Sequence, residues 1–323
     1  MNLPDINAVR KAYSAVKEFV RKTPVQHSGL LNARTESKLF FKCENFQKAG
    51  AFKYRGATNA LLRVKKSGDT TAVATHSSGN HAGALALAAK INRLKCHVVM
   101  PESSPQIKID AVRNYGAEII FCKSTLAARE ETLEKVVAKT GASFIHPYNN
   151  YYIIAGQGTA MLEFSGQVDN LECVIAPVGG GGLLSGTAIA AKAYDKSITV
   201  YGAEPLGADD ACRSFKAGYI IPSVNPVTMA DGLLTSLGDL TFRLISKHVD
   251  DILTVSEDAI ARALWLIWTR MKIIAEPSAC VPLAAVLEYP QLFRNKRTGI
   301  ILSGGNTDLR NLQGILNNSQ LTG

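Results

Sequence analysis

The feature that most limits how this chain can fold is a unit that occurs three times. Each unit has an apolar strand-like run, a turn rich in glycine and serine, and then a helix-like segment. The runs and their turns are 72–75 with 76–80, 173–178 with 179–182, and 299–302 with 303–306. In parallel sheets, such turns gather at the carboxyl ends of the strands, where ligands bind. The unit therefore predicts a parallel sheet with a binding site along one edge.

Strand-like and helix-like segments also alternate between residues 72 and 140. The expected strands there are 72–75, 96–100 and 118–121, and the expected helices are 82–92, 105–115 and 127–140. Elsewhere, strands are expected at 39–43, 173–178, 198–203 and 299–302, and helices at 5–22, from 53 onward, 153–165, 183–194, 257–274 and after 306. Such alternation is typical of α/β folds, in which helices flank a parallel-rich sheet.

Length and composition agree with a globular α/β chain of about two domains. The chain has 323 residues, of which 46% are hydrophobic and 20% charged. It contains no apolar run near the roughly 20 residues that span a membrane, and its N-terminus lacks a signal-peptide pattern. The six cysteines are scattered without a C-x-x-C pair, so buried thiols of a cytoplasmic protein are expected rather than a disulfide or zinc framework.

The formal net charge of +9 is spread along the chain without a long Lys/Arg block. A protein that binds nucleic acid usually concentrates its basic residues in one patch or stripe. A dispersed positive field also attracts small phosphates and carboxylates. The charge therefore favours an anionic small-molecule ligand over nucleic acid.

The strongest candidate for a catalytic residue is Lys53, which follows Phe52 and opens an expected helix. Burial, or a neighbouring cation such as Arg55, would lower its pKa and free the amine for Schiff-base chemistry. A lysine alone is weak evidence, because most lysines are solvated surface residues. The three glycine- and serine-rich turns are what strengthen the hypothesis.

The four consecutive glycines at 179–182 allow backbone amides to wrap closely around an anion. A dinucleotide fingerprint is absent, and the spacing of a P-loop has Thr187 where lysine is required. The loop therefore favours a lone phosphate over a di- or triphosphate. A purely structural turn is the alternative.

The turn 76–81 opens a helix whose amides could hold a carboxylate, with Ser78 offering a hydroxyl. An ordinary helix N-cap is the alternative. His76 and His81 are five residues apart and lack the H-E-x-x-H pattern, so no zinc site is expected there.

Six motifs together resemble the fold-type II pyridoxal-phosphate enzymes, most closely the serine racemase and serine/threonine dehydratase family. In order they are Phe-Lys-Tyr-Arg-Gly-Ala at 52–57, Ser-Ser-Gly-Asn-His at 77–81, Ala-Gly-Gln-Gly-Thr at 155–159, the glycines at 179–182, Glu-Pro-Ser-Ala at 276–279 and Ser-Gly-Gly-Asn at 303–306. The resemblance covers about residues 5–312. It implies a tryptophan-synthase-β-like fold with a large domain (1–66 and 148–323) and a small mobile domain (67–147).

The resemblance also implies roles for individual residues. Lys53 would bond to the aldehyde of pyridoxal phosphate and later act as a base on the substrate, with Ser78 on the opposite face. Asn80 would hydrogen-bond the ring hydroxyl oxygen, and Ser303 would contact the pyridine nitrogen. The implied cofactor-binding set is Phe52, Lys53, Asn80, Gly179, Gly180, Gly181, Gly182, Gly232, Glu276 and Ser303. The implied substrate-binding set is Ser77, Ser78, Gly79, Asn80 and His81.

In metal-binding members of this family a divalent cation is held by a Glu, a backbone carbonyl and an Asp. Glu204, Ala208 and Asp210 match that spacing. Two carboxylates and a carbonyl suit Mg²⁺, Mn²⁺ or Ca²⁺, with water completing the shell. A solvated acidic loop is the alternative.

The activity implied by the resemblance is dehydration of serine, threonine or 3-hydroxyaspartate to a 2-oxo acid and ammonia, accompanied by serine racemisation, in a homodimer. Racemisation as the main reaction and β-replacement of the cysteine synthase type are alternatives. The β-replacement enzymes usually carry Thr-Ser-Gly-Asn-Thr where this chain has Ser-Ser-Gly-Asn-His. A protein that binds the cofactor or a metabolite without turnover is a further alternative. Gly83 stands where nucleotide-activated racemases commonly have Gln, which leaves activation by ATP open.

Overall fold

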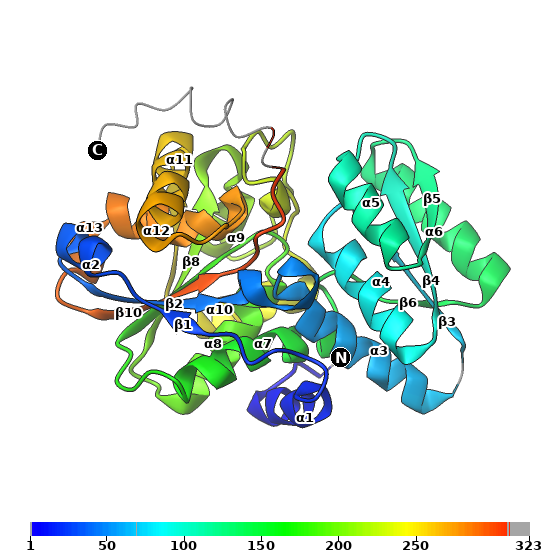
Figure 1. Ribbon diagram of the computed structural model, residues 1–323, viewed down its shortest axis with the longest axis horizontal. Coiled ribbons are helices and arrows are strands. Elements are labelled where there is room, and N and C mark those ends of the chain that lie inside the picture. Colours follow the sequence, from blue (N-terminus) through cyan, green and yellow to red (C-terminus); the bar gives the residue numbers. More distant parts are fainter. Residues whose placement is uncertain (1, 69, 309, 311–323) are drawn as a thin grey trace.

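The computed structural model describes residues 2–68, 70–308 and 310, and contains two sheets in separate halves of the molecule (Figure 1). The helix predicted after residue 306 falls mainly on 309 and 311–323 and so lies outside the described residues. None of the described helices is long and apolar enough to cross a membrane.

The larger sheet has six strands in the order β1-β2-β10-β7-β8-β9. β1 pairs antiparallel with β2, and the other neighbours are parallel. The strands are β1 (Val25–Gln26), β2 (Lys38–Cys43), β7 (Cys173–Pro177), β8 (Thr199–Pro205), β9 (Asp251–Val255) and β10 (Arg297–Leu302). Its helices are α1 (Ile6–Val16), α2 (Gly29–Thr35), α7 (Tyr151–Ser165), α8 (Gly182–Tyr194), α9 (Asp210–Ala217), α10 (Asp239–His248), α11 (Glu257–Leu266), α12 (Pro277–Glu288) and α13 (Pro290–Phe293).

Helices cover both faces of this sheet, because successive strand residues point to opposite sides. Ile300 of β10 belongs to the apolar cluster that includes α11 and α12, whereas its neighbour Ile301 belongs to the cluster that includes α7, α8 and α10. The strands therefore need apolar residues at nearly every position, as the continuous run 299–302 suggested.

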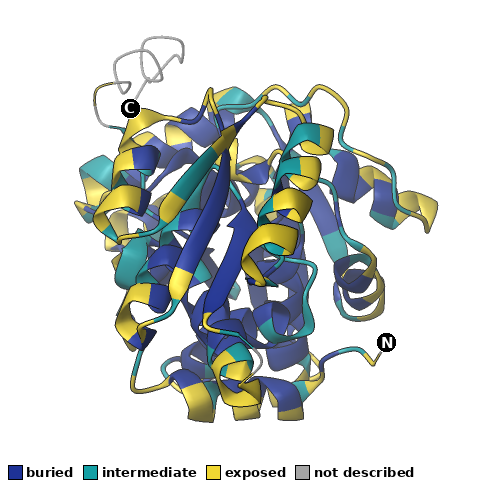
Figure 2. Cartoon of the chain, turned by 90° about the vertical axis from the view of Figure 1, so that its right-hand side faces the viewer, coloured by how far each residue is buried: buried dark blue, intermediate teal, exposed yellow. Residues whose placement is uncertain are grey.

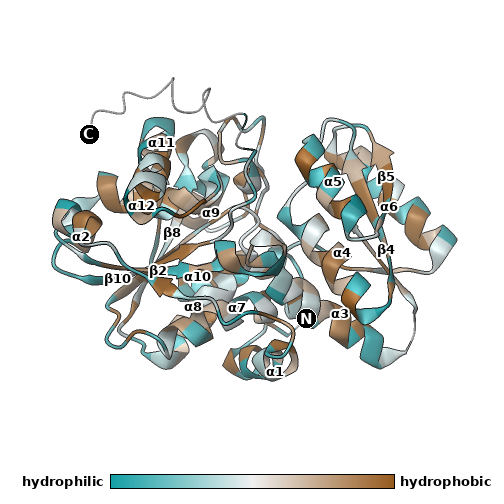
Figure 3. Ribbon diagram, in the orientation of Figure 1, coloured by the Kyte–Doolittle hydropathy of each residue, from teal (hydrophilic) through white to brown (hydrophobic). Residues whose placement is uncertain are grey.

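The smaller sheet is wholly parallel, in the order β5-β4-β3-β6. Its strands are β3 (Ala72–His76), β4 (Lys95–Pro101), β5 (Glu118–Cys122) and β6 (Ser143–Phe144), and the helices of this half are α4 (Asn80–Asn92), α5 (Gln106–Asn114) and α6 (Leu126–Thr140). Helix α3 (Lys53–Ser67) lies between the halves and contacts α4 of this half and α7 of the larger half. β3 and most of β4 are buried (Figure 2). α5 and α6 alternate hydrophilic and hydrophobic residues, as surface helices do (Figure 3). The α/β fold class predicted from the alternation is confirmed.

The structure differs from the sequence prediction in the segment 257–274. The helix α11 ends at Leu266 and is followed by a π-helical turn, Ile267–Met271, and by Lys272 in the left-handed region at φ 58°. The apolar pattern continues across this turn, so periodicity could not mark the end of the helix. The indole Nε1 of Trp268 donates to the carbonyl oxygen of Ala275 at 3.0 Å and ties the departing chain back to the turn.

Strands of both sheets deliver the turns singled out in the sequence to one cavity. β3 of the smaller sheet leads into Ser77, whereas β7 and β10 of the larger sheet lead into the glycine loop and Ser303. A bridge between Ala51 and Gly304 brings the start of α3 to the end of β10. Lys53 is therefore held at the edge where the turns meet.

Candidate active site

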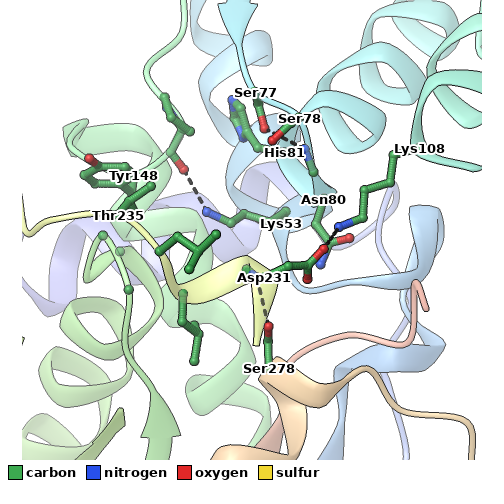
Figure 4. A pocket seen from close by; sticks show the side chains of 18 of the residues that line it. Lys53, Ser77, Ser78, Asn80, His81, Lys108, Tyr148, Asp231, Thr235 and Ser278 are labelled. Carbon is green, nitrogen blue, oxygen red and sulfur yellow. Dashed lines mark hydrogen bonds and ion pairs between the residues drawn. The ribbon is translucent and has the colours of Figure 1, made fainter. Parts of the chain in front are cut away.

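A cavity of 320 Å³ lies where these turns meet, and residues from both halves of the molecule line it (Figure 4). All predicted cofactor- and substrate-binding residues line this one cavity, although they come from distant parts of the chain. They are Phe52, Lys53, Ser77, Ser78, Gly79, Asn80, His81, Gly179, Gly180, Gly181, Gly182, Gly232, Glu276 and Ser303. Lys108, Arg129, Tyr148 and Asp231 also line the cavity and were not predicted.

Lys53 is the first residue of α3, and its amine projects into the cavity (Figure 4). The amide of Phe52 donates to the carbonyl oxygen of Ser303 at 2.9 Å, which fixes the start of the helix. The Nζ atom donates to the carbonyl oxygen of Pro147 at 3.0 Å. Burial lowers the pKa of Lys53 to about 8, and the nearby carboxyl of Glu276 only partly opposes this shift. Burial, rather than the charge of Arg55, thus makes the amine available as a nucleophile near neutral pH.

The glycine loop 179–182 has no room for side chains. Gly181 has φ of 83°, a conformation that favours glycine. A Cβ atom at Gly180 would lie 2.4 Å from the ring of Tyr148. The loop passes directly into α8, whose N-terminus has no side-chain cap. Uncapped amides and the positive end of the helix dipole make this loop suited to an anion such as phosphate.

The turn at 77–81 provides a second helix N-terminus in the cavity. α4 begins at Asn80 without a side-chain cap, and the hydroxyl of Ser77 instead accepts from the amide of Gly79 at 3.2 Å. His81 is buried, and neither of its ring nitrogens has a partner among the described residues. Burial, and to a smaller extent the charge of Lys53, holds the pKa of His81 well below its usual value, so its imidazole is neutral.

Asn80 links the two halves of the molecule across the cavity. Its Nδ2 donates to Glu276 Oε1 at 2.7 Å, and its Oδ1 accepts from Asn306 Nδ2 at 2.9 Å. One N–H of the Asn80 amide therefore remains for a ligand. Burial, and to a smaller extent the charge of Asp231, raises the pKa of Glu276 to about 7. Glu276 can thus exchange a proton near neutral pH.

Among the cations that line the cavity, Lys53 donates to a carbonyl and Lys108 pairs with Asp231 (Figure 4). Arg129, on α6, differs from both. Its Nε atom is buried and has no hydrogen-bond partner in the described part of the chain. A buried guanidinium N–H without an acceptor is costly, which points to a ligand group that completes it.

The three residues predicted to hold a metal lie away from this cavity, between the end of β8 and the start of α9. Glu204 caps α9, because its carboxylate oxygens accept from the amides of Ala211 at 3.0 Å and Cys212 at 2.9 Å. Both carboxylate oxygens of Asp210 are buried and without a partner in the described chain. Ala208 lies between them in a 3-10 turn, Leu206–Ala208.

Burial raises the pKa of Glu204 to about 9 and that of Asp210 to about 6. Burial disfavours the charged form of a carboxyl group, and the two neighbouring acidic groups disfavour each other's ionisation. Among the described residues, no group of three or more His, Cys, Asp or Glu side chains could hold a metal. The predicted site would depend on two carboxylates, a backbone carbonyl and water.

Comparison with known proteins agrees with the geometry. The family described as "Pyridoxal-phosphate dependent enzyme" matches residues 16–304. The chain is 49% identical to a beta-hydroxyaspartate dehydratase of Paracoccus denitrificans over 97% of this chain and 99% of that protein. It is 47% identical to a serine racemase of Dictyostelium discoideum over 96% of this chain and 97% of that protein.

A solved structure of maize serine racemase superposes with a TM-score of 0.94 at 43% identity and covers 97% of each chain. The family model and the similarity of both sequence and fold extend over nearly the whole chain. This chain therefore belongs to the pyridoxal-phosphate-dependent enzyme family, as its motifs predicted.

Proposed function

We propose that this enzyme dehydrates 3-hydroxy amino acids to a 2-oxo acid and ammonia, with 3-hydroxyaspartate as its preferred substrate and serine racemisation as a second activity. The observation that carries the proposal is an amine of lowered pKa, Lys53, facing a glycine cradle and an uncapped helix N-terminus within one cavity. Both relatives named above, a dehydratase and a racemase, support this pair of reactions.

The residues present fit pyridoxal phosphate. The loop 179–182 and the N-terminus of α8 would hold its phosphate, and Lys53 would bond to its aldehyde. Ser303, buried at the end of β10, would face the pyridine nitrogen, and Asn80 would donate its remaining N–H to the ring hydroxyl oxygen. When bound, the cofactor withdraws electrons from Cα of an attached amino acid and makes the Cα–H bond acidic.

The side chains of the cavity would then bind the substrate and move its protons. Amides of the turn 77–81 would hold the α-carboxylate at the N-terminus of α4. Lys53, once released from the aldehyde, would accept the α-proton from one face. The β-hydroxyl would leave with a proton as water, and Lys53 would displace the product nitrogen from the aldehyde. The freed imino acid would then add water and lose ammonia, which gives the 2-oxo acid.

Arg129 supports a substrate with a second carboxylate. Its charge acts on both His76 and Tyr148, which line the cavity, so the guanidinium is close to the space that a substrate side chain would fill. Serine and threonine offer no anion to this group, whereas 3-hydroxyaspartate does. A guanidinium–carboxylate contact is directional and strong when partly desolvated.

Replacing Arg129 by Met is expected to lower kcat/KM for 3-hydroxyaspartate by roughly 10- to 100-fold, the value of one or two hydrogen bonds to a charged group. The same change should alter kcat/KM for L-serine by less than about fivefold, because serine lacks the second carboxylate. Steady-state assays of 2-oxo acid release measure kcat/KM for each of the two substrates.

Lys135→Met, on the exposed side of the same helix, is the matched control, because Lys135 pairs only with Glu131 on the surface. It should leave both values unchanged. Equal losses for the two substrates in the Arg129 variant would contradict the role in selecting a dicarboxylate. Absence of 2-oxo acid from every hydroxy amino acid, with the wild-type enzyme, would overturn the proposed function itself.

We further propose that a divalent cation binds between Glu204, Ala208 and Asp210. The carboxylate of Asp210, which is buried and has no partner among the described residues, supports this site together with the fully buried Glu204. Such a cation would stabilise the folded chain by mass action, since it binds the native arrangement of ligands.

Removing the cation with a chelator is therefore expected to lower Tm by about 5 °C, and Mg²⁺ or Mn²⁺ should restore it. Asp210→Asn should abolish this response. Asp209→Asn is the control, because Asp209 pairs with Arg213 at the surface and should not affect the response. An Asp210→Asn protein that responds to chelator and metal like its parent would place the cation elsewhere, as differential scanning fluorimetry can show.

The division into a domain of 1–66 with 148–323 and a domain of 67–147 is supported by the two separate sheets. Assembly as a homodimer and a cytoplasmic location remain predictions. The six cysteines support the latter, since all are buried and unpaired in the described chain.

A further inference from the structure

We propose that Arg55 positions Lys53 for its reaction through two-point contacts with Glu44 and Glu163, inside a buried cluster of four charges that Lys42 completes. The proposal rests on the assignment of Lys53 as the residue that bonds to the cofactor. It adds a positioning role for side chains that lie outside the cavity. None of the four lines the cavity.

Arg55 lies at the centre of the cluster, two residues after Lys53, and its side chain is fully buried. It pairs with Glu44 through Nε–Oε2 at 2.7 Å and Nη2–Oε1 at 2.8 Å. It pairs with Glu163 through Nη1–Oε1 at 2.9 Å and Nη2–Oε2 at 2.8 Å. The guanidinium thus holds one carboxylate on each side in a two-point contact.

Lys42 completes the cluster. Its amine donates to Glu163 Oε2 at 2.9 Å, to Gln167 Oε1 at 2.7 Å and to the carbonyl oxygen of Thr23 at 2.9 Å. Two positive and two negative groups therefore balance. Burial alone would raise the pKa of Glu44, but the charge and hydrogen bonds of Arg55, the charge of Lys42 and the hydrogen bond from Thr23 together lower it, so this carboxylate is ionised.

The cluster joins four elements behind the cavity. Lys42 belongs to β2, Glu44 to the 3-10 turn that follows it (Glu44–Phe46), Arg55 to α3 and Glu163 to α7. Helix residues two apart point to nearly opposite sides, since each residue turns the helix by about 100°. Lys53 therefore faces the cavity while Arg55 faces the cluster, and the first turn of α3 is held from behind.

The backbones of α3 and α7 also touch at this turn. A Cβ atom on Gly156 would lie 2.6 Å from the Cα atom of Gly56, and the amide of Gly56 donates to Gln157 Oε1 at 3.1 Å. Close apolar contact alone would allow α3 to slide or rotate slightly against α7. The two-point guanidinium contacts have fixed directions and remove that freedom.

The test compares Arg55→Lys with Lys42→Met. The first keeps the charge but loses the two-point contacts of Arg55, whereas the second leaves those contacts intact and removes one balancing charge. Both are expected to lower Tm by about 5 to 10 °C, because each disturbs a buried ion cluster. Only Arg55→Lys should displace the Lys53 side chain from its position in the cavity.

The readout is the rate at which protein stripped of its cofactor by hydroxylamine forms its lysine adduct with added pyridoxal phosphate, followed by absorbance. In Arg55→Lys the rate constant should fall on the order of 10- to 100-fold, the cost of an ångström-scale misplacement. In Lys42→Met it should stay within about twofold of the parent. If Arg55→Lys does not fold, Glu44→Gln, which removes one charged contact of Arg55 at equal size, serves in its place.

Equal slowing in both variants, in step with their loss of Tm, would show that the cluster only stabilises the fold. An unchanged rate in Arg55→Lys would likewise overturn the inference. Both outcomes leave the proposed function intact as long as the parent protein forms its adduct on Lys53. An adduct on another lysine in the parent would instead overturn the proposed function.

Discussion

Replacing Lys53 by Ala is expected to lower both dehydration and racemisation on the order of 10⁴-fold or more, because the variant loses its nucleophile and the base for the α-proton together. The fold should survive, since this side chain forms no ion pair within the described part of the chain, where its amine donates to the carbonyl oxygen of Pro147. Release of 2-oxo acid and change in optical rotation measure the two reactions. Lys48→Ala is the control, because Lys48 is a nearby lysine that does not line the cavity.

Because the pKa of Lys53 is lowered, the rate at which its amine bonds to the cofactor is expected to depend on pH. Only the neutral amine attacks an aldehyde, so the rate of adduct formation should rise with pH through a midpoint near 8, where burial places the pKa of Lys53. An ordinary lysine would place that midpoint near 10.5. A midpoint at the ordinary value would show that the amine is solvated in the free enzyme, contrary to its place in the cavity.

Ser78→Ala is expected to separate the two reactions. Inverting Cα requires that a proton leave from one face and arrive at the other, and one base held on one face cannot easily do both. Lys53 would serve one face and the Ser78 hydroxyl the other. The variant should therefore lose interconversion of L- and D-serine and turnover of D-serine, but keep L-serine dehydration, reduced on the order of 10- to 100-fold by lost positioning.

Chiral chromatography of serine together with an assay for pyruvate follows both reactions in one sample. Ser103→Ala is the matched control, because Ser103 lines the same cavity but contacts Ser124 at the surface. It should retain both reactions. Interconversion of the enantiomers at the parental rate in Ser78→Ala would assign the second face to another residue.

The fold and most of the cavity could be predicted because their signals are local in the chain. β3, β7 and β10 are short apolar runs that end in glycine or serine, and ligands bind at the carboxyl ends of parallel strands. The turns at 77–81 and 179–182 and Ser303 were therefore expected to form the site. They line one cavity, although β3 belongs to the smaller sheet and β7 and β10 to the larger one.

Other features had no such signal. Lys108 and Arg129 lie on ordinary amphipathic helices, where a basic residue most often faces solvent, and only the packing of α5 and α6 onto the smaller sheet turns them toward the cavity. The helix α12 was not predicted, because nearly all of its residues are buried and it contains Pro282, so the sequence shows no amphipathic period there. The charged partners of Arg55 come from the turn after β2 and from α7, which no spacing along the chain connects.

Reduction of the purified enzyme with borohydride, followed by mass spectrometry of its peptides, identifies the lysine that bonds to the cofactor. One pyridoxyl group per chain is expected, attached to Lys53 in the peptide that contains Phe52 and Tyr54, and none in Lys53→Ala. A pyridoxyl group on any other lysine, or none in a protein saturated with pyridoxal phosphate, would show that Lys53 is not the residue that bonds to the cofactor.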